Sequence, residues 1–174
     1  MLGIMGEYRA VGGAGSWLAF WLLSAALGYF LVLAVRLAGI DIREHRLPNR
    51  LVLPAYPAAF VLLSAAALAA GEPARISSML MAGAGLWGGY FLLRLISPAG
   101  MGFGDVKLAG VLGLYLGFAG WSHAVAGTVA AFVLGGLWGL GLILSRRGTA
   151  RTAIPFGPFM LAGACLALLL PALQ

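Results

Sequence analysis

Six long apolar runs follow one another along this 174-residue chain, and they constrain its fold more than any other feature. Hydrophobic residues make up 62% of the sequence and charged residues only 9%. A soluble domain of this size cannot bury so much apolar surface, so the sequence predicts an integral membrane protein. A helix needs about 20 residues to cross the ~30 Å hydrocarbon core. We therefore predict an all-α, polytopic protein of about six transmembrane helices, over Ser16–Ala38, Leu51–Ala70, Ile76–Ile96, Val106–Trp121, His123–Leu144 and Ile154–Leu170.

The fourth run is the shortest of the six, which suggests a helix that starts below the level of the lipid headgroups. The runs follow closely on one another, so we expect the whole chain, residues 1–174, to form a single membrane-embedded domain.

The basic residues divide unequally between the two sides of such a bundle. Only Arg9 and Arg75 belong to one side. The positive-inside rule places the richer side in the cytoplasm and both termini outside. The net charge of +6 then reflects topology and contact with anionic membrane lipid, and no nucleic acid partner is expected. The richer side holds Arg36, Arg43, Arg46, Arg50, Arg94, Lys107, Arg146, Arg147 and Arg151.

Carboxylates are scarce, and three of the five belong to the predicted cytoplasmic side. Asp41 closely follows the first predicted helix in "AGIDIREHRLPN", Glu44 comes three residues later, and Asp105 opens the fourth helix after the glycine-rich turn "GMGFG". This topology puts Asp41 and Asp105 at the same depth of the same membrane face.

Each aspartate also has a simpler interpretation. Asp41 fits a polar residue that faces water at a helix end, and Asp105 fits a helix N-cap. An N-cap, however, does not need the three alternating glycines at 100, 102 and 104. Such glycines are typical of a place where another backbone, such as that of a substrate, must come close. Acids at a membrane border are also costly unless they are paired or hydrated, which makes them functional candidates.

Two carboxylates that meet at a helix interface favour the chemistry of an aspartic peptidase. One ionised acid draws a proton from water while the other, protonated, donates a hydrogen bond to the scissile carbonyl. This chemistry needs no metal and no cofactor. The sequence has two histidines, one cysteine (Cys165, expected to serve packing) and no H-E-x-x-H motif, so we predict no metal site.

Three blocks of the sequence resemble a known family. "GMGFGDVKL" resembles the G-x-G-D signature of presenilin-like membrane aspartic peptidases, and its flanking residues resemble specifically the type IV prepilin peptidases. "DIREHRLPN" resembles the first aspartate motif of that family, and "IPFGPFMLAG" resembles its third characteristic block. The match spans roughly residues 16–171.

The resemblance implies that Asp41 and Asp105 are the catalytic pair. It also implies a reaction, the removal of a short leader peptide from pilin-like precursor proteins, usually after a glycine. The cleavage would take place at the cytoplasmic border of the bacterial inner membrane, in type IV pilus assembly and protein secretion. The residues that would shape the site or bind substrate are Gly102, Gly104, Lys107, Pro155 and Gly157.

The chain differs from the longer family members in one respect. Those members carry a cysteine-bearing cytoplasmic insert near the N-terminus and are linked to methylation of the new pilin N-terminus. These 174 residues contain no such insert. The chain therefore resembles the short, peptidase-only form associated with tight-adherence (Flp-type) pili, and methyltransferase activity is not expected.

Two alternatives come from other functional classes. In a small ion-coupled transporter, Asp41 or Asp105 would bind the ion and glycine-rich stretches such as "GGLWGLG" would be packing faces. A non-enzymatic pilus assembly factor would need no acid chemistry at all. The role of Glu44 also stays open, because it could crowd the aspartates or pair with an arginine.

Overall fold

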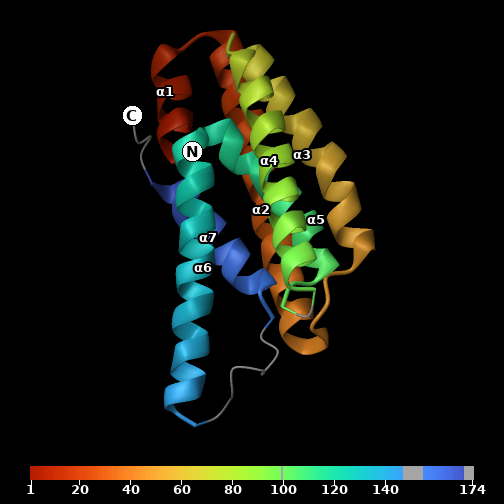
Figure 1. Ribbon diagram of the computed structural model, residues 1–174. Coiled ribbons are helices and arrows are strands. Elements are labelled where there is room, and N and C mark those ends of the chain that lie inside the picture. Colours follow the sequence, from red (N-terminus) through yellow and green to blue (C-terminus); the bar gives the residue numbers. More distant parts are fainter. Residues whose placement is uncertain (99, 147–154, 171–174) are drawn as a thin grey trace.

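A computed structural model describes residues 1–98, 100–146 and 155–170. All regular secondary structure in these ranges is helical, as the sequence predicts (Figure 1). The helices are α1 (Leu2–Val11), α2 (Ala14–Glu44), α3 (Asn49–Ala69), α4 (Ala74–Ile96), α5 (Phe103–Ala119), α6 (Trp121–Leu144) and α7 (Gly157–Leu169).

Each of the six predicted runs forms a helix, but two of the boundaries differ in ways that matter for the site. The helix expected to end at Ala38 continues to Glu44 as α2. The helix expected to start at Ile154 begins at Gly157 as α7, and Ile154 itself lies outside the described residues. The chain also has an additional short helix, α1, ahead of the first predicted run.

Four helices, α2, α3, α4 and α6, are long and apolar enough to cross a membrane. The other two runs give shorter helices. α5 has 17 residues, in line with the expectation that the fourth run is short, but α7 is shorter still at 13 residues. The fourth run is the shortest in the sequence, but of the two helices α7 is the shorter. The reason is that α7 begins only at Gly157, after the non-helical residues Pro155 and Phe156.

The short helix α5 forms the centre of the bundle. Every residue from Val106 to Ala119 except Lys107 is buried. By contrast, α6 exposes most of its apolar surface, including Leu137 and Trp138. Exposed apolar residues are expected where a helix faces lipid.

Glycine lets α5 pack directly against the backbone of α4. A β-carbon added at Gly113 would lie 2.6 Å from the Ala82 carbonyl oxygen and 2.6 Å from Cα of Gly83. The same kind of contact joins α7 to α6, because a β-carbon added at Gly163 would lie 2.6 Å from the Gly127 carbonyl oxygen. Small residues at such crossings allow two helix backbones to approach closely inside a membrane.

The unpredicted helix α1 packs on the end of the bundle that carries the α3–α4 turn. It buries Ile4 and Tyr8, and the Tyr8 hydroxyl donates a hydrogen bond of 2.6 Å to Glu72 in that turn. Arg75 also binds Glu72 and donates to the Phe118 carbonyl oxygen at the end of α5. Burial opposes the charged form of Glu72, but the hydrogen bonds from Arg75 and Tyr8 outweigh it and lower the pKa of this carboxyl.

Helix α1 and the aspartates lie at opposite ends of the molecule. In Figure 1, α1, the start of α2 and the α3–α4 turn are at the top, whereas the α2–α3 and α4–α5 connections are at the bottom. The Met1 amino group donates to the Leu168 carbonyl oxygen at 2.9 Å, which places the end of α7 beside α1. Asp41 and the turn before Asp105 therefore belong to the same end of the bundle.

The close α4–α5 contact predicts a steric effect of Gly113→Ala. The added methyl group would meet backbone atoms of α4, which cannot rotate away, so we expect the free energy of unfolding to fall by about 1–3 kcal/mol. The thermal unfolding midpoint of the purified protein in detergent measures this. Gly85→Ala is the matched control, because a β-carbon there has nothing within 4 Å. Equal midpoints for the two variants would contradict the close packing.

Candidate active site

Asp41 lies in the last turn of α2 rather than after the end of the helix, as the sequence had suggested. Its side chain is directed into the protein and is only 4% exposed. The carboxylate oxygen Oδ2 accepts a hydrogen bond of 3.1 Å from the backbone N–H of Gly157, the first residue of α7. A buried carboxylate needs such a partner, and here a residue 116 positions away supplies it.

Asp105 is the third residue of α5, so it opens this helix as predicted. It is 9% exposed, and its Oδ2 accepts a hydrogen bond of 3.1 Å from the backbone N–H of Gly102. Gly102, and not Asp105, is the N-cap residue. The simpler interpretation of Asp105 is therefore partly right. Its carboxylate stabilises the start of the helix by accepting a hydrogen bond from the N–H of the N-cap residue, as in a capping box.

Leu47 joins the surroundings of the two aspartates. A β-carbon added at Gly104 would lie 2.9 Å from Cβ of Leu47, and one added at Gly157 would lie 3.4 Å from its Cδ2. Leu47 is thus packed between the residue that precedes Asp105 and the residue that binds Asp41.

The motif glycines make room for the protein's own side chains. A β-carbon added at Gly157 would lie 2.6 Å from Oδ2 of Asp41, and one added at Gly102 would lie 3.1 Å from Oδ2 of Asp105. Leu47 occupies the corresponding space at Gly104. The sequence interpretation assigned these glycines to the approach of a substrate backbone. In this structure their first effect is to let the carboxylates and Leu47 pack together.

Lys107 ties the start of α5 to the start of α3. Its Nζ donates a hydrogen bond of 2.9 Å to Oδ1 of Asn49 and lies 4.8 Å from the centre of the Phe103 ring. The Tyr56 hydroxyl donates to the Lys107 carbonyl oxygen at 2.6 Å. Lys107 therefore fixes the helix that carries Asp105, and two residues of α3 that sequence reasoning did not single out share this role.

Arg94 holds the glycine-rich turn from the other side. One guanidinium nitrogen, Nη1, donates to the Met101 carbonyl oxygen at 2.6 Å, and the guanidinium carbon lies 5.4 Å from the Phe103 ring centre. We had counted Arg94 only as a basic residue of the cytoplasmic side. Its position four residues before "PAGMG" gave no signal of this contact.

Two other predicted residues lie near the site without binding an aspartate. Pro155 is half-buried and lies two residues before Gly157, in the segment that leads into α7. Glu44 is turned toward solvent and pairs with Arg46 at 2.9 Å, with the two side chains 49% and 77% exposed. The open question about Glu44 is therefore answered in favour of pairing with an arginine.

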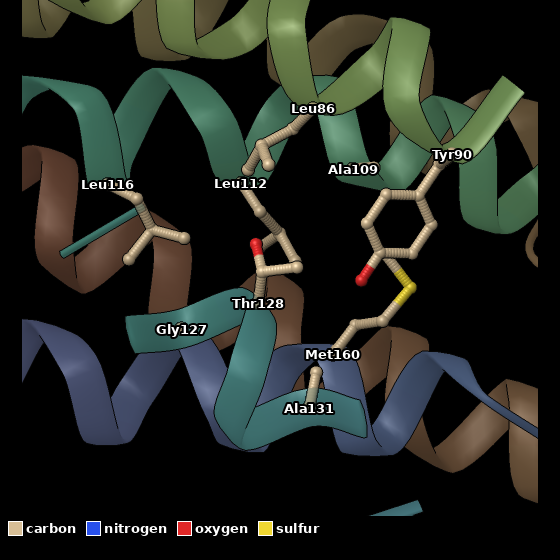
Figure 2. Close-up of a pocket in the computed structure, with 9 residues that line it drawn as sticks. All are labelled: Leu86, Tyr90, Ala109, Leu112, Leu116, Gly127, Thr128, Ala131 and Met160. Atoms are coloured by element: carbon tan, nitrogen blue, oxygen red, sulfur yellow. The ribbon is translucent and has the colours of Figure 1, made fainter. Parts of the chain in front are cut away.

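A small cavity lies between α4, α5, α6 and α7, and Ala109, one helical turn after Asp105, lines it. Its volume is about 10 Å³, roughly the space that one water molecule needs. Figure 2 shows the Tyr90 hydroxyl beside Met160 and the Thr128 side chain at the centre of the lining. The Thr128 hydroxyl already donates to the Ala124 carbonyl oxygen at 2.8 Å. This cavity is too small for a peptide.

Among the residues whose positions are described, no three His, Cys, Asp or Glu side chains come close enough together to hold a metal ion. Cys165 is half-buried in α7, eight residues beyond Gly157. What the structure brings together at the α2–α3 end of the bundle is a pair of buried carboxylates, each bound by one backbone N–H.

A model of the type IV leader peptidase family matches residues 26–140, which include both aspartates. The chain belongs to this family. The match ends before α7, so Gly157 lies outside it.

Several curated proteins named prepilin leader peptidase/N-methyltransferase are similar to the chain. The one from Stutzerimonas stutzeri is 30% identical over 96% of this chain and 55% of its own length. Those from Aeromonas salmonicida and Bacillus subtilis are 33% and 32% identical over 86% and 80% of this chain, and 50% and 53% of their own lengths. The chain thus spans about half the length of these relatives. No solved structure matches it.

Proposed function

We propose that this family member is an aspartic endopeptidase that removes the leader peptide from prepilin or pseudopilin precursors. The observation that carries the proposal is the pair of buried aspartates, which come from helices far apart in the sequence. Their neighbours Gly104 and Gly157 both contact Leu47. Family membership supports leader peptide cleavage, and the printed names of the relatives supply the precursor class.

The proposed mechanism uses one proton shared between Asp41 and Asp105. The ionised carboxylate takes a proton from a water molecule, whose oxygen then bonds to the scissile carbonyl carbon. The protonated carboxyl donates a hydrogen bond to the carbonyl oxygen and stabilises the negative charge that develops there. The tetrahedral intermediate collapses, the C–N bond breaks, and the leaving amine receives a proton from the pair.

The location of this chemistry follows from the charge distribution. The end of the bundle with both aspartates also carries Arg43, Arg46 and Arg50. Under the positive-inside rule, this end faces the bacterial cytoplasm, in the inner membrane, with both chain termini outside. The precursor would therefore present its leader at the cytoplasmic border of the bilayer. On this proposal the matching blocks within residues 16–171 work as one unit.

The proposed chemistry predicts that both carboxylates are indispensable. Asp41→Asn and Asp105→Asn keep the shape of the side chain but cannot hold or transfer the shared proton, so cleavage should fall by about 10²–10⁴-fold or more. The measurement is the conversion of a co-expressed precursor to its mature form, with the amount of each variant in the membrane determined in parallel.

Glu44→Gln is the matched control, because Glu44 lies one turn from Asp41 but points to solvent, and it should process precursor at the wild-type rate. Chelation by EDTA should leave the wild type active. Near-normal cleavage by either Asn variant would contradict the dyad, and it would favour a role in pilus assembly or transport instead.

We also propose that these 174 residues cleave the precursor without methylating the product, although the relatives are named for both activities. The support is the single cysteine, Cys165, which lies in α7 and not in a cytoplasmic insert. Purified protein given precursor and S-adenosylmethionine should therefore release the leader and leave the new N-terminus unmodified. Mass spectrometry of the mature product reads this directly, and a mass increase of one methyl group would overturn the peptidase-only assignment.

A further inference from the structure

The loop between α2 and α3 is exposed to solvent except at one side chain. Residues 42–46 are all exposed, and so are Asn49 and Arg50. Leu47 alone is buried within this stretch, with 8% of its surface exposed. A lone apolar side chain that turns inward from a polar loop packs against the protein interior. The packing partners of Leu47 include Gly104 and Gly157, which are next to the aspartates in the site.

The contacts of Leu47 are with parts of the site that carry function. Its Cβ faces Gly104, the residue before Asp105, and its Cδ2 faces Gly157, whose N–H binds Asp41. Gly104 lacks the β-carbon that would push Leu47 away, since that atom would lie 2.9 Å from Cβ of Leu47. The side chain therefore lies between the glycine-rich turn that precedes Asp105 and the start of α7.

This position conflicts with the needs of the proposed reaction. A scissile carbonyl and a water molecule must come between the carboxylates, within hydrogen-bond reach of both. Leu47 occupies space between their supporting turns, and both carboxyl groups are almost fully buried. While Leu47 packs against Gly104 and Gly157, a peptide backbone has no room against these two glycines.

The loop is built so that such a movement is local. α2 ends at Glu44, and the next residue, His45, has a left-handed backbone conformation with φ 51°. α3 begins after Pro48. On the far side, Asn49 stays bound to Lys107. A change in the backbone around His45 and Arg46, or in the rotamer of Leu47, could move the leucine without disturbing either helix.

We propose that Leu47 is a positioning residue that occludes the active site in the free protein and withdraws when the substrate binds. In the free state it holds the glycine-rich turn and the start of α7 at a fixed separation. On binding, the peptide backbone takes its place against Gly104 and Gly157. The occlusion can be tested without any activity, whereas its kinetic consequence rests on the proposed peptidase function.

Thiol reactivity tests the occlusion directly. The test protein carries Asp41→Cys and Cys165→Ser, so its only thiol lies at the site. The rate at which a small charged methanethiosulfonate modifies this thiol measures how easily a reagent in water reaches it. Adding Leu47→Ala should speed the modification about tenfold, because the occluding side chain is shortened. Leu53→Ala is the matched control, since Leu53 is 50% exposed on α3, and it should leave the rate unchanged. Equal rates with and without Leu47→Ala would overturn the proposal.

Steady-state kinetics test the two roles separately. With both aspartates present, Leu47→Ala should lower KM about tenfold, because the substrate no longer displaces a buried leucine. It should also lower kcat, because Leu47 no longer holds the glycine-rich turn and the start of α7 at a fixed separation. Leu47→Met, which conserves volume, should restore both values toward the wild type. A fall in kcat with unchanged KM would reduce Leu47 to a structural residue and overturn the occlusion.

The two measurements also separate this proposal from the proposed function. If Leu47→Ala exposes the thiol but the wild type cleaves no precursor, the occlusion stands and the peptidase assignment fails. If the wild type cleaves precursor but Leu47→Ala changes neither thiol reactivity nor KM, the peptidase assignment stands and the occlusion fails. Should Leu47→Ala fail to accumulate, Leu47→Val provides a smaller truncation with changes expected in the same direction.

Discussion

The hydrogen bond from the Gly157 N–H to the Asp41 carboxylate is the contact on which the rest of the structure depends. A carboxylate that is 4% exposed is unfavourable unless it is hydrogen-bonded, and α7 supplies the donor only because its first turn reaches into the bundle. The contact also requires glycine, since a β-carbon there would lie 2.6 Å from the carboxylate oxygen.

The second aspartate is held to the same place by different means. Asp105 caps the start of its own helix through Gly102, and that helix is fixed by direct backbone packing against α4 and by the Lys107–Asn49 and Tyr56–Lys107 hydrogen bonds to α3. α3 in turn follows the loop that carries Leu47. The segments around the two carboxylates are therefore interdependent. Lys107, which fixes the helix of Asp105, is bound by α3, and α3 follows the helix of Asp41 in the chain.

Much of this could be predicted from the sequence, because a membrane protein shows its helices as apolar runs and its functional acids as rare exceptions. The six runs became helices, and the scarcity of carboxylates singled out Asp41 and Asp105. Helix α1 was missed because its ten residues are too few to stand out, although the apolar spacing of Ile4 and Tyr8 was a signal. Leu47 was missed because burial of one loop residue depends on Gly104 and Gly157, which are distant in sequence. The same reason hid Arg94 and Tyr56, whose partners are carbonyl oxygens of other segments.

The central claim is that Asp41 and Asp105 act together through one shared proton, and the pH dependence of kcat/KM tests it most directly. A pair that works with one proton loses activity at low pH, where both carboxyls are protonated, and at high pH, where both are ionised. The account therefore predicts a bell-shaped profile for cleavage of a precursor by the purified protein, with tryptophan fluorescence confirming that the fold persists across the range. Activity that keeps rising or stays level toward high pH would contradict it, because no carboxyl in the pair could then be required in its protonated form.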